Sequence, residues 1–195
     1  MWDVLCRDFF QKYVQPDACV VEIAAGYCEF INHIKAARRI AIDINPDTRN
    51  HAGEGVEVLV VSAMELHEIG DEIADVVFVS NFFEHISKPD MIRCLTEALR
   101  VLKPGGSLLI LQPNYRYCWR DYWMFFDHIT PIDDRALTEA LELAGFKIDR
   151  CIPRFLPYTT KQRFPQEAWL VRLYLKLPFL WYLFGAQAFV CGRKK

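Results

Sequence analysis

The sequence lacks the features that mark zinc-binding, secreted or repetitive proteins. Seven cysteines occur among 195 residues, but no two have Cys-x-x-Cys spacing, so we expect no zinc site and predict no metal. The opening Met1-Trp2-Asp3 has no basic region followed by an apolar run, as a secretory signal would. The sequence therefore favours a reducing cytoplasm, with most thiols acting as small core residues.

What is present suits one globular domain over residues 1–195. Hydrophobic residues make up 52% of the chain and charged residues 25%, which is enough apolar surface for a real core. The formal net charge of −2 gives no indication of a nucleic-acid partner.

Charge is distributed unevenly along the chain. Residues 151–195 carry a net charge of +7, with Glu167 as the one acid against eight bases: Arg154, Lys161, Arg163, Arg172, Lys176, Arg193, Lys194 and Lys195. The first 150 residues carry −9. One interpretation of this asymmetry is that the tail faces an anionic substrate or a membrane surface. The other is that the tail carries solvated surface charge that balances an acidic body.

Apolar, β-rich runs alternate with helical patterns after an opening helix over 2–14. The alternation predicts an α/β fold with a Rossmann-like doubly wound sheet, mostly parallel with an antiparallel last strand. Expected strands are 18–23, 39–42, 56–61, 75–79, 107–111, 146–152 and 186–191, and expected helices lie near 28–37, 47–52, 65–70, 88–102 and 133–144. An aromatic segment, residues 113–132, shows no clean period.

A strand, turn and helix pattern near the start of the chain suggests a cofactor site. Residues 20–23 end near Glu22 and are followed by the small residues Ala24-Ala25-Gly26, which let a ligand approach the backbone closely. Asp43 ends the next expected strand, where a carboxylate can accept hydrogen bonds from a ribose. An ordinary turn and a helix-capping aspartate would give the same pattern.

These segments together resemble the class I S-adenosylmethionine-dependent methyltransferase family, in particular its small-molecule, type 11-like branch. Leu102-Lys103-Pro104-Gly105-Gly106 is the most specific match, and residues 18–112 carry the motifs. The resemblance implies S-adenosylmethionine as the cofactor. It implies that the methionine and ribose moieties lie against Glu22, Ala24, Gly26, Asp43 and Ile44, that Ser62, Ala63 and Met64 flank the adenine, and that Asn81 lies under the cofactor.

The turn departs from the Gly-x-Gly-x-Gly pattern of this family, because Ala24 and Cys28 replace the outer glycines. An added methyl group either fits or costs about 1–3 kcal/mol by overpacking. A nicotinamide cofactor is the rival, but its fingerprint would place Glu29 against a diphosphate, which a carboxylate opposes.

Two histidines are the catalytic candidates. His85 follows the fourth expected strand, and His128 lies beside Asp127 in the aromatic segment, which is expected to cover the acceptor. For His85, capping of the next helix is the alternative to a role as general base.

Residues 153–185 form a basic, apolar insert between the last two expected strands, where the family has a short hairpin. Arg172, Lys176 and Pro178 break it too often for a transmembrane helix, so we expect a cap over the substrate side, a homodimer contact or a peripheral membrane contact. The sequence thus predicts methyl transfer to a small-molecule, glycan or lipid-linked acceptor. The alternative is an inactive binding or scaffold protein of the same fold, peripheral to a membrane.

Overall fold

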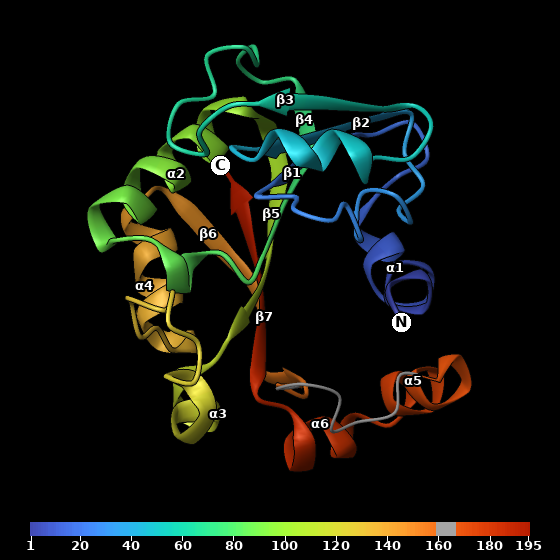
Figure 1. Cartoon of the computed structure of the whole chain (residues 1–195), viewed down its shortest axis with the longest axis vertical. Helices are drawn as coiled ribbons and strands as arrows, with labels where there is room; N and C mark the ends of the chain where they lie inside the picture. The colour runs from blue at the N-terminus through green and yellow to red at the C-terminus, as the bar shows by residue number, and fades with distance from the viewer. Residues whose placement is uncertain (159–166) are drawn as a thin grey trace.

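The chain folds around one seven-stranded sheet in the order β3-β2-β1-β4-β5-β7-β6 (Figure 1). The structure is a computed structural model that describes residues 1–158 and 167–195, so Lys161 and Arg163 of the insert lie outside the described residues. The strands are β1 (Cys19–Ile23), β2 (Arg38–Asp43), β3 (Val56–Val60), β4 (Ala74–Ser80), β5 (Leu102–Pro113), β6 (Phe146–Leu156) and β7 (Gln187–Lys194).

The predicted fold class is confirmed. Strands β1 to β5 pair in parallel, while β7 is antiparallel to both β5 and β6. The strand order reverses direction between β1 and β4, and this switch point is where open α/β sheets bind their ligands, beyond the carboxyl ends of the strands.

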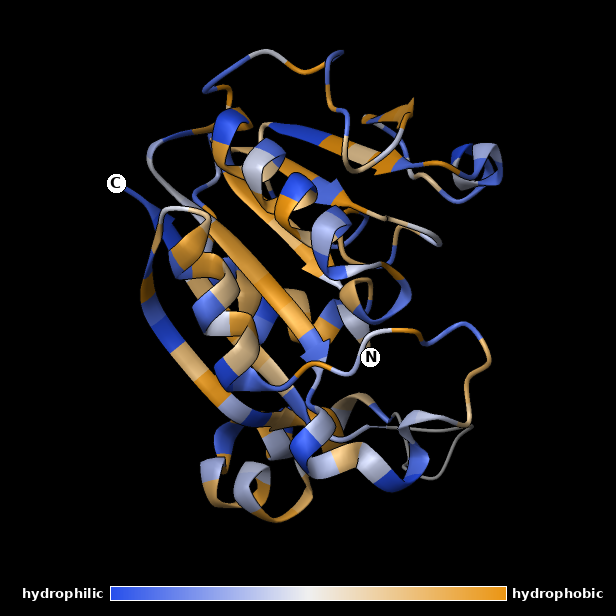
Figure 2. Ribbon diagram, turned by 90° about the vertical axis from the view of Figure 1, so that its left-hand side faces the viewer, coloured by the Kyte–Doolittle hydropathy of each residue, from blue (hydrophilic) through white to orange (hydrophobic). Residues whose placement is uncertain are grey.

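Helices cover both faces of the sheet. Helices α2 (Lys88–Val101) and α4 (Asp134–Leu143) lie on one face and α1 (Trp2–Asp8) on the other (Figure 1). The apolar run in β4 serves both layers, because Val77 and Val79 face the α2 side while Val76 and Phe78 face the α1 side. The central strands are accordingly coloured as hydrophobic in Figure 2.

The two long helices begin and end at residues suited to those positions. The Ser87 side chain accepts a hydrogen bond from the Asp90 amide at the start of α2, and Asp133 accepts from Arg135 and Ala136 at the start of α4. Gly145, at a φ of 101°, follows α4 and allows the chain to turn into β6.

Two of the predicted helices are wrong, and a third is a 3₁₀ helix. Residues 28–37 form a series of turns, because Cys28 has a positive φ and the Ile31 amide donates to the Glu22 side chain instead of a helical carbonyl. Residues 65–70 are also turns, and the predicted helix at 47–52 is a 3₁₀ helix, η2 (Pro46–Asn50).

The opening helix and the fifth strand also differ from prediction. The opening helix is interrupted at Phe9, so that α1 is followed by a 3₁₀ helix, η1 (Phe10–Tyr13). Strand β5 starts at Leu102 and not at Ser107, and its register against β4 shifts between Ala74 and Val76. A Cβ on Gly106 would lie 2.9 Å from the Lys103 carbonyl oxygen, so this close approach requires glycine.

The aromatic segment and the insert gather at one end of the sheet (Figure 1). The aromatic segment contains helix α3 (Tyr115–Tyr122), which the sequence did not predict, and the insert contains α5 (Ala168–Lys176) and α6 (Pro178–Phe184). None of the helices among the described residues has the length and apolarity needed to cross a membrane. All seven cysteines are free, and six are buried.

Candidate cofactor and acceptor site

The turn after β1 keeps the backbone of a glycine-rich loop without its outer glycines. Ala24, Gly26 and Cys28 all have positive φ angles, of 55°, 50° and 57°. Left-handed angles cost a non-glycine residue about 1–2 kcal/mol, so surrounding contacts must hold this turn in place. One such contact is the Ala25 amide, which donates to the Ile42 carbonyl at the end of β2 at 2.9 Å.

Asp43 connects this turn to the end of β2. Its Oδ2 accepts a hydrogen bond from the Gly26 amide at 2.8 Å, and its Oδ1 accepts from the Asn45 amide at 2.8 Å. A carboxylate offers about four lone-pair positions, so Asp43 can still accept hydrogen bonds from ribose hydroxyls.

Glu22 is buried beneath the same turn. Its Oε2 accepts from the Ile31 amide at 2.9 Å and thereby holds the irregular segment after Cys28. Burial raises the pKa of Glu22 to about 8, while the Ile31 amide lowers it and the charges of Glu29 and Asp43 add to the rise. Glu22 therefore has a structural role that its sequence position did not reveal.

A pocket of about 150 Å³ opens at the carboxyl ends of β1, β2, β3 and β4. Six of the nine predicted cofactor residues line it: Ala24, Asp43, Ile44, Ser62, Ala63 and Met64. Ile42, Phe82 and Ile86 complete the lining and were not predicted. Its apolar character fits an adenine ring, and Ile44, whose side chain is 73% exposed, stands at its rim.

The remaining three predicted cofactor residues do not line this pocket. Glu22 lies under the turn, Gly26 lies on its exposed side, and Asn81 follows β4 with a φ of 47°. The Asn81 amide donates to the Leu111 carbonyl at 2.9 Å, which joins the ends of β4 and β5.

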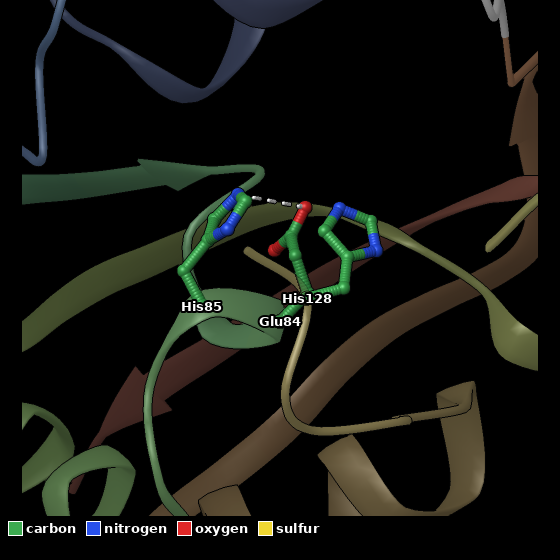
Figure 3. A group of neighbouring side chains, drawn as sticks. All are labelled: Glu84, His85 and His128. Carbon is green, nitrogen blue, oxygen red and sulfur yellow. Dashed lines mark ion pairs between the residues drawn. The ribbon is translucent and has the colours of Figure 1, made fainter. Parts of the chain in front are cut away.

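The two candidate histidines lie together just beyond β4, although 43 positions separate them in the sequence. Glu84 and His85 belong to a 3₁₀ helix, η3 (Phe83–His85), and His128 comes from the loop after α3. The His85 and His128 ring centroids are 5.0 Å apart, and in Figure 3 the Glu84 carboxylate lies between the rings. The Ile129 and Thr130 amides donate to the Glu84 carbonyl and attach the loop to η3.

Burial sets the electrostatics of this cluster. The Glu84 carboxylate is buried, and it accepts from Gln112 Nε2 at 2.7 Å; desolvation raises its pKa. His128 is also buried, and desolvation followed by the nearby His85 lowers its pKa, which keeps the imidazole neutral with a free lone pair at neutral pH. His128 Nδ1 has no hydrogen-bond partner among the described residues.

His85 is oriented by Asp127. Its Nδ1 lies 3.2 Å from both the Asp127 carbonyl oxygen and the Asp127 Oδ2, while its Nε2 lies 3.8 Å from Glu84 Oε1. The sequence interpretation had placed Asp127 beside His128 as its orienting acid. In the structure it is His85 that contacts this acid.

A larger hollow of about 440 Å³ lies at the opposite end of the sheet. Its lining includes Asp17, Asp75, Lys103 and Arg193, from the amino ends of β4 and β5 and the end of β7. Ligands of open α/β sheets lie at the carboxyl ends, so this hollow is not the candidate site.

Comparison with known proteins agrees with this geometry. Residues 21–110 match a family model described as a methyltransferase domain. A curated relative, methyltransferase ucsB of Acremonium sp., is 26% identical over 169 residues; the match covers 76% of this chain and 54% of the relative. The chain thus spans about half the length of that relative.

Two solved structures share the fold over almost the whole chain. A SAM-dependent methyltransferase from Archaeoglobus fulgidus has a TM-score of 0.71 at 20% identity, covering 98% of this chain and 92% of that one. The N-methyltransferase NodS from Bradyrhizobium japonicum WM9, solved with S-adenosyl-L-homocysteine, has a TM-score of 0.61 at 14% identity, covering 91% and 78%. Residues 21–110 thus resemble a methyltransferase domain, and the chain as a whole shares the fold of these S-adenosylmethionine-dependent methyltransferases.

At this site, sequence reasoning missed residues for two different reasons. Phe82 and Ile86 stand in the matched segment after β4, but an apolar residue there gives no signal that it faces a pocket. Glu84 did give a signal, since a carboxylate within an apolar stretch is unusual, yet its position between two imidazoles depends on a loop 44 residues later.

Proposed function

We propose that the chain transfers a methyl group from S-adenosylmethionine to a small-molecule, glycan or lipid-linked acceptor. The observation that carries this proposal is the pocket at the switch point of the sheet, where Ala24, Asp43 and Ser62 meet from three separate strand ends. Glu22, Gly26 and Asn81 shape the surrounding turns, and S-adenosylmethionine would extend from the pocket across Gly26.

The chemistry requires mainly positioning. Methyl transfer is an in-line displacement at the sulfonium methyl, so the protein must align the acceptor atom with that methyl and exclude water. The acceptor would lie over η3, with His85 and the neutral His128 as candidates to accept its proton.

The surface around this entrance supports an acceptor with an apolar part. Exposed apolar side chains project from the aromatic segment and from the insert: Trp119, Trp123, Met124, Phe126, Ile129, Trp169, Leu173, Phe179, Tyr182 and Leu183. Surfaces of this kind serve binding of lipids or proteins. They also suit the cap, the homodimer contact and the peripheral membrane contact that the insert suggested.

Titration calorimetry with S-adenosylhomocysteine tests the cofactor site. We expect micromolar binding, weakened about 10- to 100-fold in Asp43→Ala, because the variant loses hydrogen bonds to the ribose and the support of Gly26. Asp47→Ala is the matched control, since this exposed carboxylate four residues later lies outside the pocket lining. Absence of binding at millimolar ligand would refute the proposal.

A binding protein without turnover is the second candidate. Its motivation is the small pocket, because ligand sites commonly measure about 300–1,000 Å³ and the methyl group of Ala24 occupies part of the entrance. The variant Ala24→Gly separates the two candidate functions. If the chain is an active methyltransferase, it binds S-adenosylhomocysteine without this change. If it is a binding protein without turnover, it gains measurable affinity for S-adenosylhomocysteine only when the methyl group of Ala24 is removed.

A further inference from the structure

The side chains of Glu84, His85 and His128 converge on one point beside the cofactor pocket. Each offers a ligand atom, and the three atoms lie within 4.8 Å of one another. The cluster adjoins the pocket because Phe82 and Ile86, on either side of Glu84-His85 in the sequence, both line it. Figure 3 shows the three side chains directed toward a common centre.

We propose that this cluster binds a divalent transition metal of the zinc type, which holds an oxygen atom of the methyl acceptor. Two imidazoles and one carboxylate are the ligand set of many catalytic zinc sites, in which a further position stays open for substrate. Magnesium fits less well, since it prefers oxygen ligands in an octahedral arrangement.

The groups behind the ligands are arranged as they are around known metal sites. A ligating histidine usually donates its second ring nitrogen to a carboxylate or carbonyl, and His85 Nδ1 has both within 3.2 Å on Asp127, which leaves Nε2 for the metal. The Glu84 carboxylate is also held by a hydrogen bond, because Gln112 Nε2 donates to Glu84 Oε2. The hydrogen bond between Gln112 and Glu84 is buried, so the Glu84 carboxylate is already held in place before a metal ion binds.

His128 contributes a buried imidazole to the cluster, with 7% of the residue exposed. In Figure 3 its Nε2 faces the Glu84 carboxylate and His85, whereas its Nδ1 points away from the cluster. Nε2 is therefore the atom that His128 offers to a metal ion.

The distances require a small closure on binding. Ligand atoms around a tetrahedral zinc ion lie about 3.3 Å apart, given metal–ligand bonds near 2.0 Å, so the ligand atoms must approach by on the order of 1 Å. His85 can supply this movement, because its side chain is 30% exposed and lies on a three-residue helix.

The inference rests on the proposed function and specifies its acceptor. With His85 and His128 as ligands, these imidazoles would hold the metal instead of accepting the proton of the acceptor. A hydroxyl group bound to the metal would be acidified and would release its proton to solvent. The resulting oxygen lone pair forms a bond to the methyl carbon as the carbon–sulfur bond breaks, and S-adenosylhomocysteine leaves with the sulfur electron pair. The acceptor class is therefore an oxygen nucleophile, such as a phenol or an enol, in preference to an amine.

Calorimetric titration of the full chain with zinc, in the absence of cofactor, tests the site. We expect one ion per chain and a loss of about 100-fold or more in affinity in Glu84→Gln and in His128→Ala. His67→Gln, at an exposed histidine, and Cys151→Ser, at the half-buried thiol, should bind as the parent does. Cobalt substitution should give a four- or five-coordinate absorption spectrum without a thiolate band.

The variants at the buried residues Glu84 and His128 could lose zinc binding because they unfold. His85→Gln is therefore tested as well, since His85 is half-exposed and its replacement disturbs the fold less. The unfolding midpoint of each metal-free variant is measured alongside. Weak zinc binding that is equal in all variants, or no binding at 100-fold excess of zinc, overturns the inference. If the chain binds S-adenosylhomocysteine but not zinc, only the proposed metal site is contradicted. If the chain binds zinc but not S-adenosylhomocysteine, only the proposed methyltransferase activity is contradicted.

Discussion

Ala24 and Cys28 hold backbone angles that glycine would adopt at no cost. Their side chains explain why they remain: Ala24 packs against the apolar cluster on the α2 face, and Cys28 is fully buried with its Sγ 3.8 Å from the Thr48 carbonyl oxygen. The packing of these two side chains thus offsets the conformational cost of their positive φ angles.

At Glu22, a buried carboxylate makes stability depend on pH. Its folded-state pKa of about 8 lies above the ordinary value of 4.5, so the folded state binds the proton more tightly than the unfolded chain. The stability that this proton contributes is present below about pH 4.5 and is lost as the pH rises toward 8.

We therefore expect Glu22→Gln to flatten the pH dependence of the free energy of unfolding. The amide can still accept from the Ile31 amide but never charges, so the variant should exceed the parent by a few kcal/mol at pH 8 and match it near pH 4.5. Urea unfolding across this range measures the difference, with Glu142→Gln, at an exposed carboxylate of α4, as the control. Parallel curves for Glu22→Gln and the parent would contradict the assignment.

Among the elements, α5 and α6 depend most on tertiary contacts. They have nine and seven residues, no side-chain cap and no fully buried residue, and helices this short are marginal in isolation. Arg154 of β6 holds α6 directly, because its guanidinium donates to the Gly185 and Leu183 carbonyls and lies over the Tyr117 and Tyr182 rings. Helix α5 is joined to α6 by the hydrogen bond from Trp181 Nε1 to the Tyr174 carbonyl.

Arg154→Ala should release the insert while the sheet stays intact. We expect faster hydrogen exchange confined to residues 168–184, because the variant loses two hydrogen bonds and both cation–π contacts with little change in the core. Lys147→Ala, an exposed cation on the same strand, should leave the exchange of the insert unchanged. If exchange accelerates throughout the sheet instead, Arg154 supports the whole fold.

For the whole molecule, the charge asymmetry of the sequence is partly compensated by ion pairs between the tail and the body. Arg193 pairs with Asp149, Lys194 with Glu72 at 3.1 Å, and Arg172 with Asp8 at 3.6 Å. The basic tail therefore balances the acidic body at several points, which favours solvated charge over anion binding for these residues.

Peripheral membrane contact, if it serves a lipid-linked acceptor, should therefore depend more on apolar than on basic side chains. We expect the double variant Phe179→Ser/Leu183→Ser to reduce cosedimentation with anionic lipid vesicles about tenfold, and Lys176→Gln to reduce it less. Leu143→Ser, on the exposed side of α4 away from this end, is the control. Equal sedimentation of the parent chain with and without vesicles would rule out membrane contact.

The sequence by itself determined the layered α/β fold, because its signals are local. Runs such as 76–79, apolar on both faces, require a covered central strand, and Ser87, Asp133 and Gly145 mark helix ends through their own side chains or backbone freedom. The lining of the pocket was predictable for the same reason, since Ala24 and Ser62 come after recognisable strands and Asp43 ends one.

Only the tertiary structure decided what depends on contacts between distant segments. Residues 28–37 have a helical pattern but lose the helix to the Glu22 carboxylate, which reaches them from the neighbouring strand. The meeting of Glu84, His85 and His128 depends on the Glu84 carbonyl accepting amides from a loop 45 residues later. No local pattern encodes such a pairing, because it is the folding of the sheet that brings the two segments together.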